Sequence, residues 1–297
     1  IEADIRVNAV RKATFSGLLA ILLWSLLALL TTATDGLPPF QVLALSFGFA
    51  ALLGLLRTTL RGRQGWNELR QPPSALALTT SALFAYHALY FIALKRAPAV
   101  EANLLNYLWP LLIVLFAGFL PGVKVRGLQI VGTLLGLVAA VILVTQGSRL
   151  QIRPEYVTGY LAALCAAVVW AAYSVLNRRH AHVPSAAITV ACALVAVLGA
   201  VVHAGFEQTV RPDLLQWGVL LLMGAGPVGA AFLLWDHGTK HGDIALLGSL
   251  SYLAPLLSTL LLVLAGRASP HWSQVVAIGL LLFGAWLSVK SPRAKQE

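Results

Sequence analysis

Ten long stretches of this chain contain no Asp, Glu, Lys or Arg, and they constrain its fold more than any other feature. They cover residues 13–34, 36–56, 71–94, 102–123, 127–148, 156–177, 180–206, 214–235, 244–266 and 268–289. Each approaches or exceeds the roughly 18–20 apolar residues that a helix needs to cross the core of a bilayer. Because lipid cannot satisfy open backbone groups, we predict an all-α integral membrane protein with ten transmembrane helices.

Positive charge is distributed by side of the membrane rather than gathered into one binding patch. The net charge is +10, yet the mean hydropathy of +0.82 lies outside the range of soluble domains. With the N-terminus placed in the cytoplasm, 15 of the 21 Lys and Arg fall on cytoplasmic segments. The other six are Lys95, Arg96, Arg149, Arg153, Arg211 and Arg267. This positive-inside bias predicts that both termini are cytoplasmic, and it argues against a nucleic-acid partner.

The two halves of the chain repeat each other at an offset of 145 residues. The segment YLWPLL at 107–112 recurs as YLAPLL at 252–257, and Trp24 matches Trp170 at an offset of 146. Tyr90 and Trp235 each precede a lysine by five residues. Each half holds five spans, an odd number, so the second copy must enter the membrane from the opposite side. We therefore predict two inverted five-helix repeats around a central cavity.

This repeat sets the expected domain boundaries. We predict no soluble domain, because the longest segment between spans, 57–70, is short and basic. The predicted parts are a cytoplasmic N-terminal tail at 1–12, a first repeat at 13–148, a linker at 149–155, a second repeat at 156–290 and a cytoplasmic C-terminal tail at 291–297.

Prolines predict where the helices are distorted. Pro110 and Pro255 occupy equivalent places in the fourth span of each half. Because proline lacks a backbone donor and clashes with the preceding turn, both helices should kink or unwind there. We expect the two five-helix halves to rock about these hinges. Pro227, within the segment GAGPVG, indicates another distorted helix, with close packing as the alternative. Gly132 and Gly136 form a small-residue face that predicts helix packing.

The spans have no charged group at their centres. This disfavours a proton-coupled drug antiporter built on a central carboxylate, and also substrates such as sugar phosphates that need a cationic clamp. Glu101, Asp236 and Asp243 lie at span ends, where solvated or interfacial roles are expected. No group of residues indicates a catalytic site, a metal site or a cofactor.

Aromatic and neutral polar side chains remain as candidates for a substrate site. His87 shares a helix face with Tyr90, and Tyr86 lies four residues before Tyr90. An intramembrane histidine is a functional candidate by default; the alternative is a neutral histidine bonded to a neighbouring helix. A single histidine is compatible with uniport, exchange or proton antiport.

The fourth and sixth spans carry polar and aromatic stripes at helical spacing. Asn103, Asn106, Tyr107 and Pro110 share one face, which lipid would leave unsatisfied. We expect Trp109 to turn toward the same cavity through the distortion at Pro110. The deeper Trp24, Trp109 and Trp170 are favoured for this role. Interfacial belt positions are expected instead for Trp66, Trp217, Trp272 and Trp286.

A cavity of this composition suits a small neutral or zwitterionic, amino-acid-like molecule. Ring faces hold an ammonium group by cation–π attraction and stack on an aromatic side chain. The predicted substrate-binding residues are Tyr86, His87, Tyr90, Asn103, Tyr107, Trp109 and Trp170. The expected partners are this substrate and the lipid bilayer, and the expected state is a monomer.

In these features the chain resembles the drug/metabolite transporter superfamily of the EamA type over residues 13–290. The five-plus-five arrangement, a Trp in the first span of each half and the YLxPLL motif carry the resemblance. Within the superfamily it is most similar to bacterial aromatic amino acid exporters, through Tyr86-His87-x2-Tyr90, Tyr107-x-Trp109-Pro110 and Trp170. The resemblance implies export of aromatic and other neutral amino acids and related metabolites across the bacterial inner membrane by alternating access. It also places those aromatic residues in the cavity lining.

Three other interpretations compete with this one. The first is an exporter of other neutral metabolites or drugs. The second is an intramembrane hydrolase that uses Ser249 or Ser251 with His87, although the chain has no Gly-x-Ser-x-Gly elbow. The third is a channel or passive scaffold, which the paired kinks of the repeat disfavour. We therefore expect a transporter and not an enzyme.

Overall fold

The computed structural model describes residues 2–148 and 153–290, and all regular secondary structure in these residues is helical. Ten helical spans in them are long and apolar enough to cross a membrane, which confirms the predicted number. The predicted linker at 149–155 lies partly, and the predicted C-terminal tail at 291–297 wholly, outside the described residues.

The first half contains five spans and one short connecting helix. In chain order its helices are α1 (Glu2–Ser25), α2 (Leu27–Thr32), α3 (Pro39–Leu60), α4 (Gly62–Glu68), α5 (Pro73–Arg96), α6 (Ala99–Asn106), α7 (Trp109–Ala117) and α8 (Gly127–Thr145). The first span is α1 with α2, and the fourth is α6 with α7. Helix α1 begins well before the uncharged stretch at 13–34, so most of the expected N-terminal tail is helical.

The second half also contains five spans, four of which include more than one helical element. Its elements are η1 (Pro154–Tyr156), α9 (Val157–Leu176), η2 (Asn177–His180), η3 (Ser185–Ala187), α10 (Ile188–Phe206), α11 (Leu214–Met223), the π-helical turn η4 (Gly224–Ala230), α12 (Ala231–His241), α13 (Ile244–Leu250), α14 (Leu253–Leu264) and α15 (Trp272–Lys290). The eighth span is α11, η4 and α12, and the ninth is α13 with α14.

The predicted distortions occur at the prolines. Pro110 is the second residue of α7, directly after the break that separates it from α6. Pro255 is the third residue of α14, directly after the break from α13. Pro227 lies inside the π-helical turn, and its carbonyl accepts a 3.0 Å hydrogen bond from Nε1 of Trp24. The distortion at Pro227 therefore supplies an acceptor at membrane depth.

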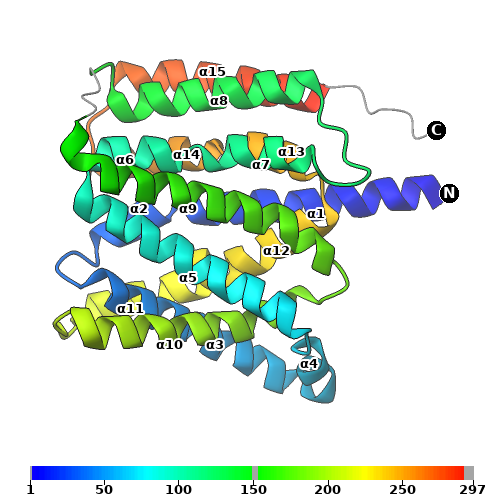
Figure 1. The fold of residues 1–297 in the computed structure, drawn as a ribbon, viewed down its shortest axis with the longest axis vertical. Helices are drawn as coiled ribbons and strands as arrows, with labels where there is room; N and C mark the ends of the chain where they lie inside the picture. Colours follow the sequence, from blue (N-terminus) through cyan, green and yellow to red (C-terminus); the bar gives the residue numbers. More distant parts are fainter. Residues whose placement is uncertain (1, 149–152, 291–297) are drawn as a thin grey trace.

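Helices from the two halves interleave (Figure 1). Helix α8 packs on α15, and α3 packs on α10. Between these two layers α1 packs on α12 and α14, whereas α9 packs on α5 and α7. Each of these packed groups therefore combines helices from both halves of the chain. We call the end of the molecule where α1 begins and α15 ends the terminal face, and the other end the opposite face (Figure 1).

Small residues allow these helices to approach closely. Gly132 of α8 lies against Gly284 of α15, where a Cβ on Gly132 would come within 2.3 Å of the Gly284 carbonyl oxygen. Gly136 lies against the ring of Tyr252. The predicted packing role of the Gly132–Gly136 face is therefore confirmed.

Candidate substrate-binding site

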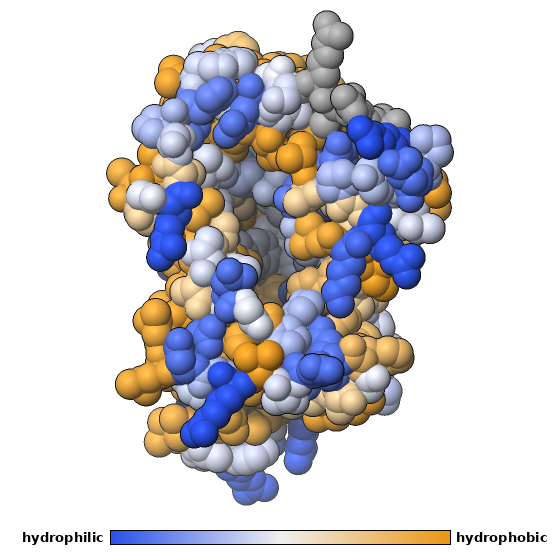
Figure 2. All heavy atoms as spheres, turned by 90° about the vertical axis from the view of Figure 1, so that its left-hand side faces the viewer, coloured by the Kyte–Doolittle hydropathy of each residue, from blue (hydrophilic) through white to orange (hydrophobic). Residues whose placement is uncertain are grey.

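A deep hollow lies at the centre of the opposite face, between two lobes of the molecule (Figure 2). The helices run approximately along the direction in which the hollow deepens (Figure 1). Following α5 backwards from Arg96, and α9 forwards from Val157, therefore leads from the mouth of the hollow toward the terminal face.

Four tryptophans meet at the centre of the molecule, and we call them the tryptophan cluster. They are Trp24 of α1, Trp109 of α7, Trp170 of α9 and Trp235 of α12. Trp24 contacts the other three, with ring centroids 5.0 Å from Trp235, 5.5 Å from Trp170 and 6.4 Å from Trp109. Trp24 is half-buried and the other three are buried. The cluster joins spans from both halves, and it includes the repeat-related pair Trp24 and Trp170.

Trp109 lies at this centre directly after the distortion beside Pro110. Trp109 begins α7 directly after the break, and its ring lies 6.4 Å from Trp170 and 6.0 Å from Trp235. By contrast, the four tryptophans that were expected outside the cavity are exposed on the outer surface, with 40–55% exposure. This confirms the predicted division between deep and peripheral tryptophans.

A layer of tyrosines and asparagines lies between the cluster and the opposite face. Tyr90 donates a hydrogen bond to Oδ1 of Asn103, and Nδ2 of Asn106 donates to the Tyr86 hydroxyl over 3.2 Å. The rings of Tyr86 and Tyr90 stack with centroids 6.2 Å apart. Tyr86 also contacts Trp170 at 5.3 Å, which joins this layer to the tryptophan cluster. The polar stripe of the fourth span therefore faces the third span.

His87 lies on the adjoining face of α5 among aromatic rings. Its Nδ1–H donates to the Leu83 carbonyl over 2.7 Å, which assigns the free acceptor to Nε2 of the neutral ring. The ring contacts Phe47 at 5.3 Å and Tyr86 at 5.2 Å. His87 therefore bonds its own helix rather than a neighbouring one, contrary to the structural alternative considered for it, and its ring is half-buried.

Two side chains differ from the sequence-based expectation of the site. Tyr107 lies at the break between α6 and α7, and its ring packs toward α8, α14 and α15 rather than into the tryptophan cluster. Trp235 belongs to the cluster but was not among the predicted site residues. Its repeat match to Tyr90 was the signal that could have identified it.

The expectation for Asp236 was wrong. Asp236 and Lys240 are buried, with 3% and 5% exposure, and their charged atoms lie 2.9 Å apart. Asn177 Nδ2 donates to Asp236 over 2.6 Å, and Lys240 Nζ donates to the Val183 carbonyl over 3.1 Å. Asp236 directly follows the uncharged stretch at 214–235, a position that predicts an interfacial role, but η2 and the loop at 181–184 cover it.

The residues proposed for a hydrolase do not form a catalytic pair. Ser249 Oγ is within 2.6 Å of Thr133 Oγ1, and Ser251 Oγ donates to the Leu247 carbonyl. His87 bonds Leu83. Each of these side chains already forms a hydrogen bond to another partner. Among the described residues, no base is therefore oriented toward either serine hydroxyl.

Comparison with known proteins identifies two family segments in the chain. The model of the EamA-like transporter family matches residues 11–145 and again residues 157–290. The two matches correspond to the two halves of the sequence repeat.

Individual relatives and a solved structure match over nearly the whole chain. The aromatic amino acid exporter YddG of Ancylobacter novellus is 47% identical over 275 residues, which cover 92% of this chain and 96% of the relative. YddG of Escherichia coli K12 is 30% identical, covering 94% of this chain and 98% of the relative. A protein crystal structure that is 45% identical superimposes with a TM-score of 0.91, over 96% of this chain and 99% of that chain.

Proposed function

This chain belongs to the EamA-like transporter family, and on that basis we propose that it exports aromatic and other neutral amino acids and related small metabolites. The observation that carries the proposal is the half-buried layer of rings and amides beside the hollow, together with the buried rings of the tryptophan cluster that it adjoins. Tyr86, His87, Tyr90, Asn103, Trp109 and Trp170 supply ring faces and neutral polar atoms without a fixed charge. Ring faces attract an ammonium group and stack on an aromatic side chain. Tyr107 would line this site only after a change at the break between α6 and α7.

Alternating access would operate between packed units that mix the two repeats. The unit of α1, α12 and α14 and the unit of α5, α7 and α9 each contain helices from both halves. Rocking of one sequence half against the other would break both sets of contacts. We therefore propose that these mixed units move, with Pro110 and Pro255 as hinges within the fourth and ninth spans. The described conformation is open at the opposite face (Figure 2).

The chain is a multi-pass bacterial membrane protein, and its orientation follows from charge. We propose the inner membrane as its location and the cytoplasm as the side of the terminal face, because most Lys and Arg lie there. The hollow would then face outward. The tryptophan cluster and the tyrosine layer are assembled within one chain, which supports a monomer as the working unit.

Transport by the purified protein tests this proposal. Reconstituted into liposomes, the protein should mediate saturable flux of labelled phenylalanine, tyrosine, tryptophan and other neutral amino acids, and much less flux of glutamate or lysine. Stimulation by an imposed pH gradient would indicate proton antiport, whereas equal rates would indicate uniport or exchange. Absence of flux for all neutral amino acids by correctly folded protein would refute the proposal.

The hinge role of the two prolines makes a separate prediction. Pro110→Ala and Pro255→Ala should each slow transport several-fold while the yield of folded protein changes little. Alanine restores a backbone donor and favours a continuous helix, so the breaks at 107–108 and 251–252 become harder to bend. Initial rates in proteoliposomes, normalised to folded protein, measure the effect. Unchanged rates in both variants would count against the hinges.

A further inference from the structure

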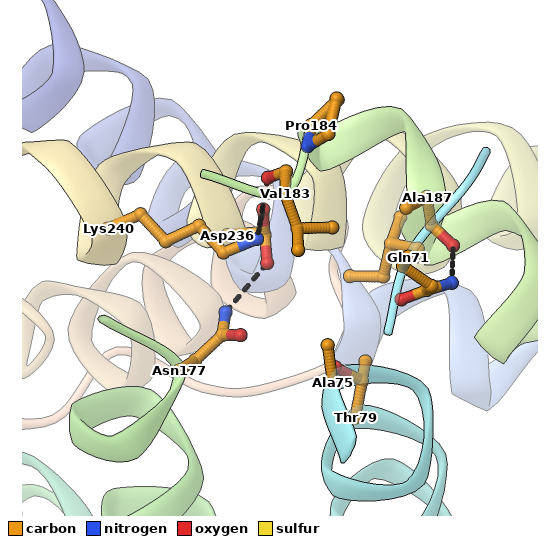
Figure 3. Close-up of a pocket in the computed structure, with 10 residues that line it drawn as sticks. Gln71, Ala75, Thr79, Asn177, Val183, Pro184, Ala187, Asp236 and Lys240 are labelled. Atoms are coloured by element: carbon orange, nitrogen blue, oxygen red, sulfur yellow. Dashed lines mark hydrogen bonds and ion pairs between the residues drawn. The ribbon is translucent and has the colours of Figure 1, made fainter. Parts of the chain in front are cut away.

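A polar pocket lies near the terminal face, where α5 begins and α9 and α12 end (Figure 3). Ala75 and Thr79 of α5 line one side, Asn177 and the loop before η3 line another, and Asp236 and Lys240 of α12 complete it. The cavity that remains is about 10 Å³, room for about one water molecule. The pocket is therefore collapsed in this conformation, and α12 meets η2 directly there.

The two charged side chains of this pocket pair with each other on α12 and also form hydrogen bonds to the other proposed moving unit. Asp236 and Lys240 belong to α12, which packs on α1. Their outside partners are the Asn177 side-chain amide and the Val183 carbonyl, both in the segment that follows α9. Opening of the terminal face would separate α12 from this segment. Asp236 would lose a donor, and Lys240 would lose an acceptor.

The lost partners have the chemistry of an amino acid's two ends. An α-ammonium group donates hydrogen bonds, as Asn177 does to Asp236, and it adds a positive charge. An α-carboxylate accepts them, as the Val183 carbonyl does from Lys240, and it adds a negative charge. Hydrogen bonds between charged groups are stronger than neutral ones. A zwitterion would therefore replace both partners at once.

We propose that Asp236 and Lys240 form an entry subsite for the zwitterionic backbone of the substrate, exposed when the terminal face opens. Asp236 binds the ammonium group and Lys240 binds the carboxylate. The subsite rests on the proposed amino acid transport and names the groups that select for it. On closure, Asn177 and Val183 take the substrate's place and release it toward the tryptophan cluster.

The position of the subsite suits this transfer. Trp235 directly precedes Asp236, and its Nε1 donates to Ser174 Oγ over 3.1 Å. Ser174 lies one helix turn before Asn177. Trp170 lies two helix turns before Asn177, so the tryptophan cluster begins within two turns of the proposed subsite.

A seal alone does not require an ion pair. Replacing a buried ion pair with apolar residues of similar volume is often neutral or stabilising, so stability alone does not account for this pair. The pair is maintained here with both outside partners in place, in a pocket too small for a ligand. Binding of a zwitterion in the open state would account for the presence of both charges.

Analogues that lack one charged group test the assignment. We would use vesicles with the terminal face outward, identified by protease access to a C-terminal tag, and measure uptake of labelled phenylalanine. Unlabelled phenethylamine, which lacks the carboxylate, and 3-phenylpropanoate, which lacks the ammonium, serve as competitors. In Lys240→Gln the half-saturation concentration of phenylalanine should rise by about tenfold or more, while phenethylamine competes as well as before or better. In Asp236→Asn the half-saturation concentration of phenylalanine should rise by a similar factor, while 3-phenylpropanoate competes as well as before or better.

Two further variants keep the test decisive if a single substitution prevents folding. The double variant Asp236→Asn/Lys240→Gln leaves no unpaired charge, and it should lose the preference for phenylalanine over both analogues. Thr239→Val is the matched control, because Thr239 is buried on the same helix and its hydroxyl bonds only that helix; its preference should not change.

Equal weakening of phenylalanine and both analogues in the charge variants, or an unchanged preference, would overturn the subsite while leaving amino acid transport intact. If the wild-type protein transports no amino acid, the proposed function itself fails.

Discussion

Trp109→Ala is expected to remove most substrate flux, leaving about a tenth or less of the wild-type rate. The Trp109 ring is buried and contacts the other three rings of the tryptophan cluster. Its removal therefore deletes one of the four ring surfaces of the cluster. Loss of a large ring that contacts a ligand costs about 2 kcal/mol or more, equivalent to a factor of about 30 in affinity. His87→Ala should have a comparable effect. It removes the neutral polar ring between Tyr86 and Phe47.

Rates must be normalised to folded protein, because a buried Trp→Ala change also lowers stability by about 3–5 kcal/mol in well-packed sites. Size-exclusion profiles of the purified variants give this normalisation, and Trp109→Phe should recover part of the flux. Trp286→Ala is the matched control, since Trp286 lies on the outside with 49% exposure. Similar losses in Trp109→Ala and Trp286→Ala would mean that the cavity is placed wrongly.

Gly284→Val is expected to have the largest effect on folding. A Cβ at Gly284 would lie 2.6 Å from the Gly132 carbonyl oxygen and 3.3 Å from the Leu135 Cβ. Backbone atoms cannot move aside as the end of a flexible side chain can, so α15 must separate from α8. In lipid this contact depends on close packing of small residues, with no water to drive the helices together again. We expect little folded protein after detergent extraction, and a markedly lower melting temperature for what remains.

Gly279→Val provides the control on the same helix. A Cβ at Gly279 meets nothing within 4 Å, so valine there extends into open space. Its yield and melting temperature should match those of the wild type. If both substitutions are tolerated equally, the close approach of α8 and α15 is not what holds these helices together.

The spans and their distortions were predictable because their causes are local. Uncharged length alone specifies a membrane helix, and proline at position 110 or 255 breaks a helix whatever surrounds it. The stripe of Asn103 and Asn106 was predictable for a related reason: a buried amide needs a partner, and Tyr90 and Tyr86 provide it.

The missed features depend on contacts between distant segments. The break between α1 and α2 at Leu26 has neither Pro nor Gly at it. Asp236 and Lys240 are four residues apart at the end of a span, a spacing that is equally common on solvated helix ends. Only the approach of η2 and the loop at 181–184 buries them, and no local pattern in the sequence specifies that approach. Tyr107 was placed by ideal helix geometry, which the break beside it does not follow.

The π-helical turn at 224–230 also sets the rotational phase of everything that follows it in the eighth span. Each residue added to a helix turn rotates the downstream segment by about 100° around its axis. The turn therefore sets which sides of α12 carry Trp235 and Asp236, and the Trp24 indole N–H bonds the Pro227 carbonyl inside it. A single hydrogen bond from the first span thus reaches the turn on which the orientation of α12 depends.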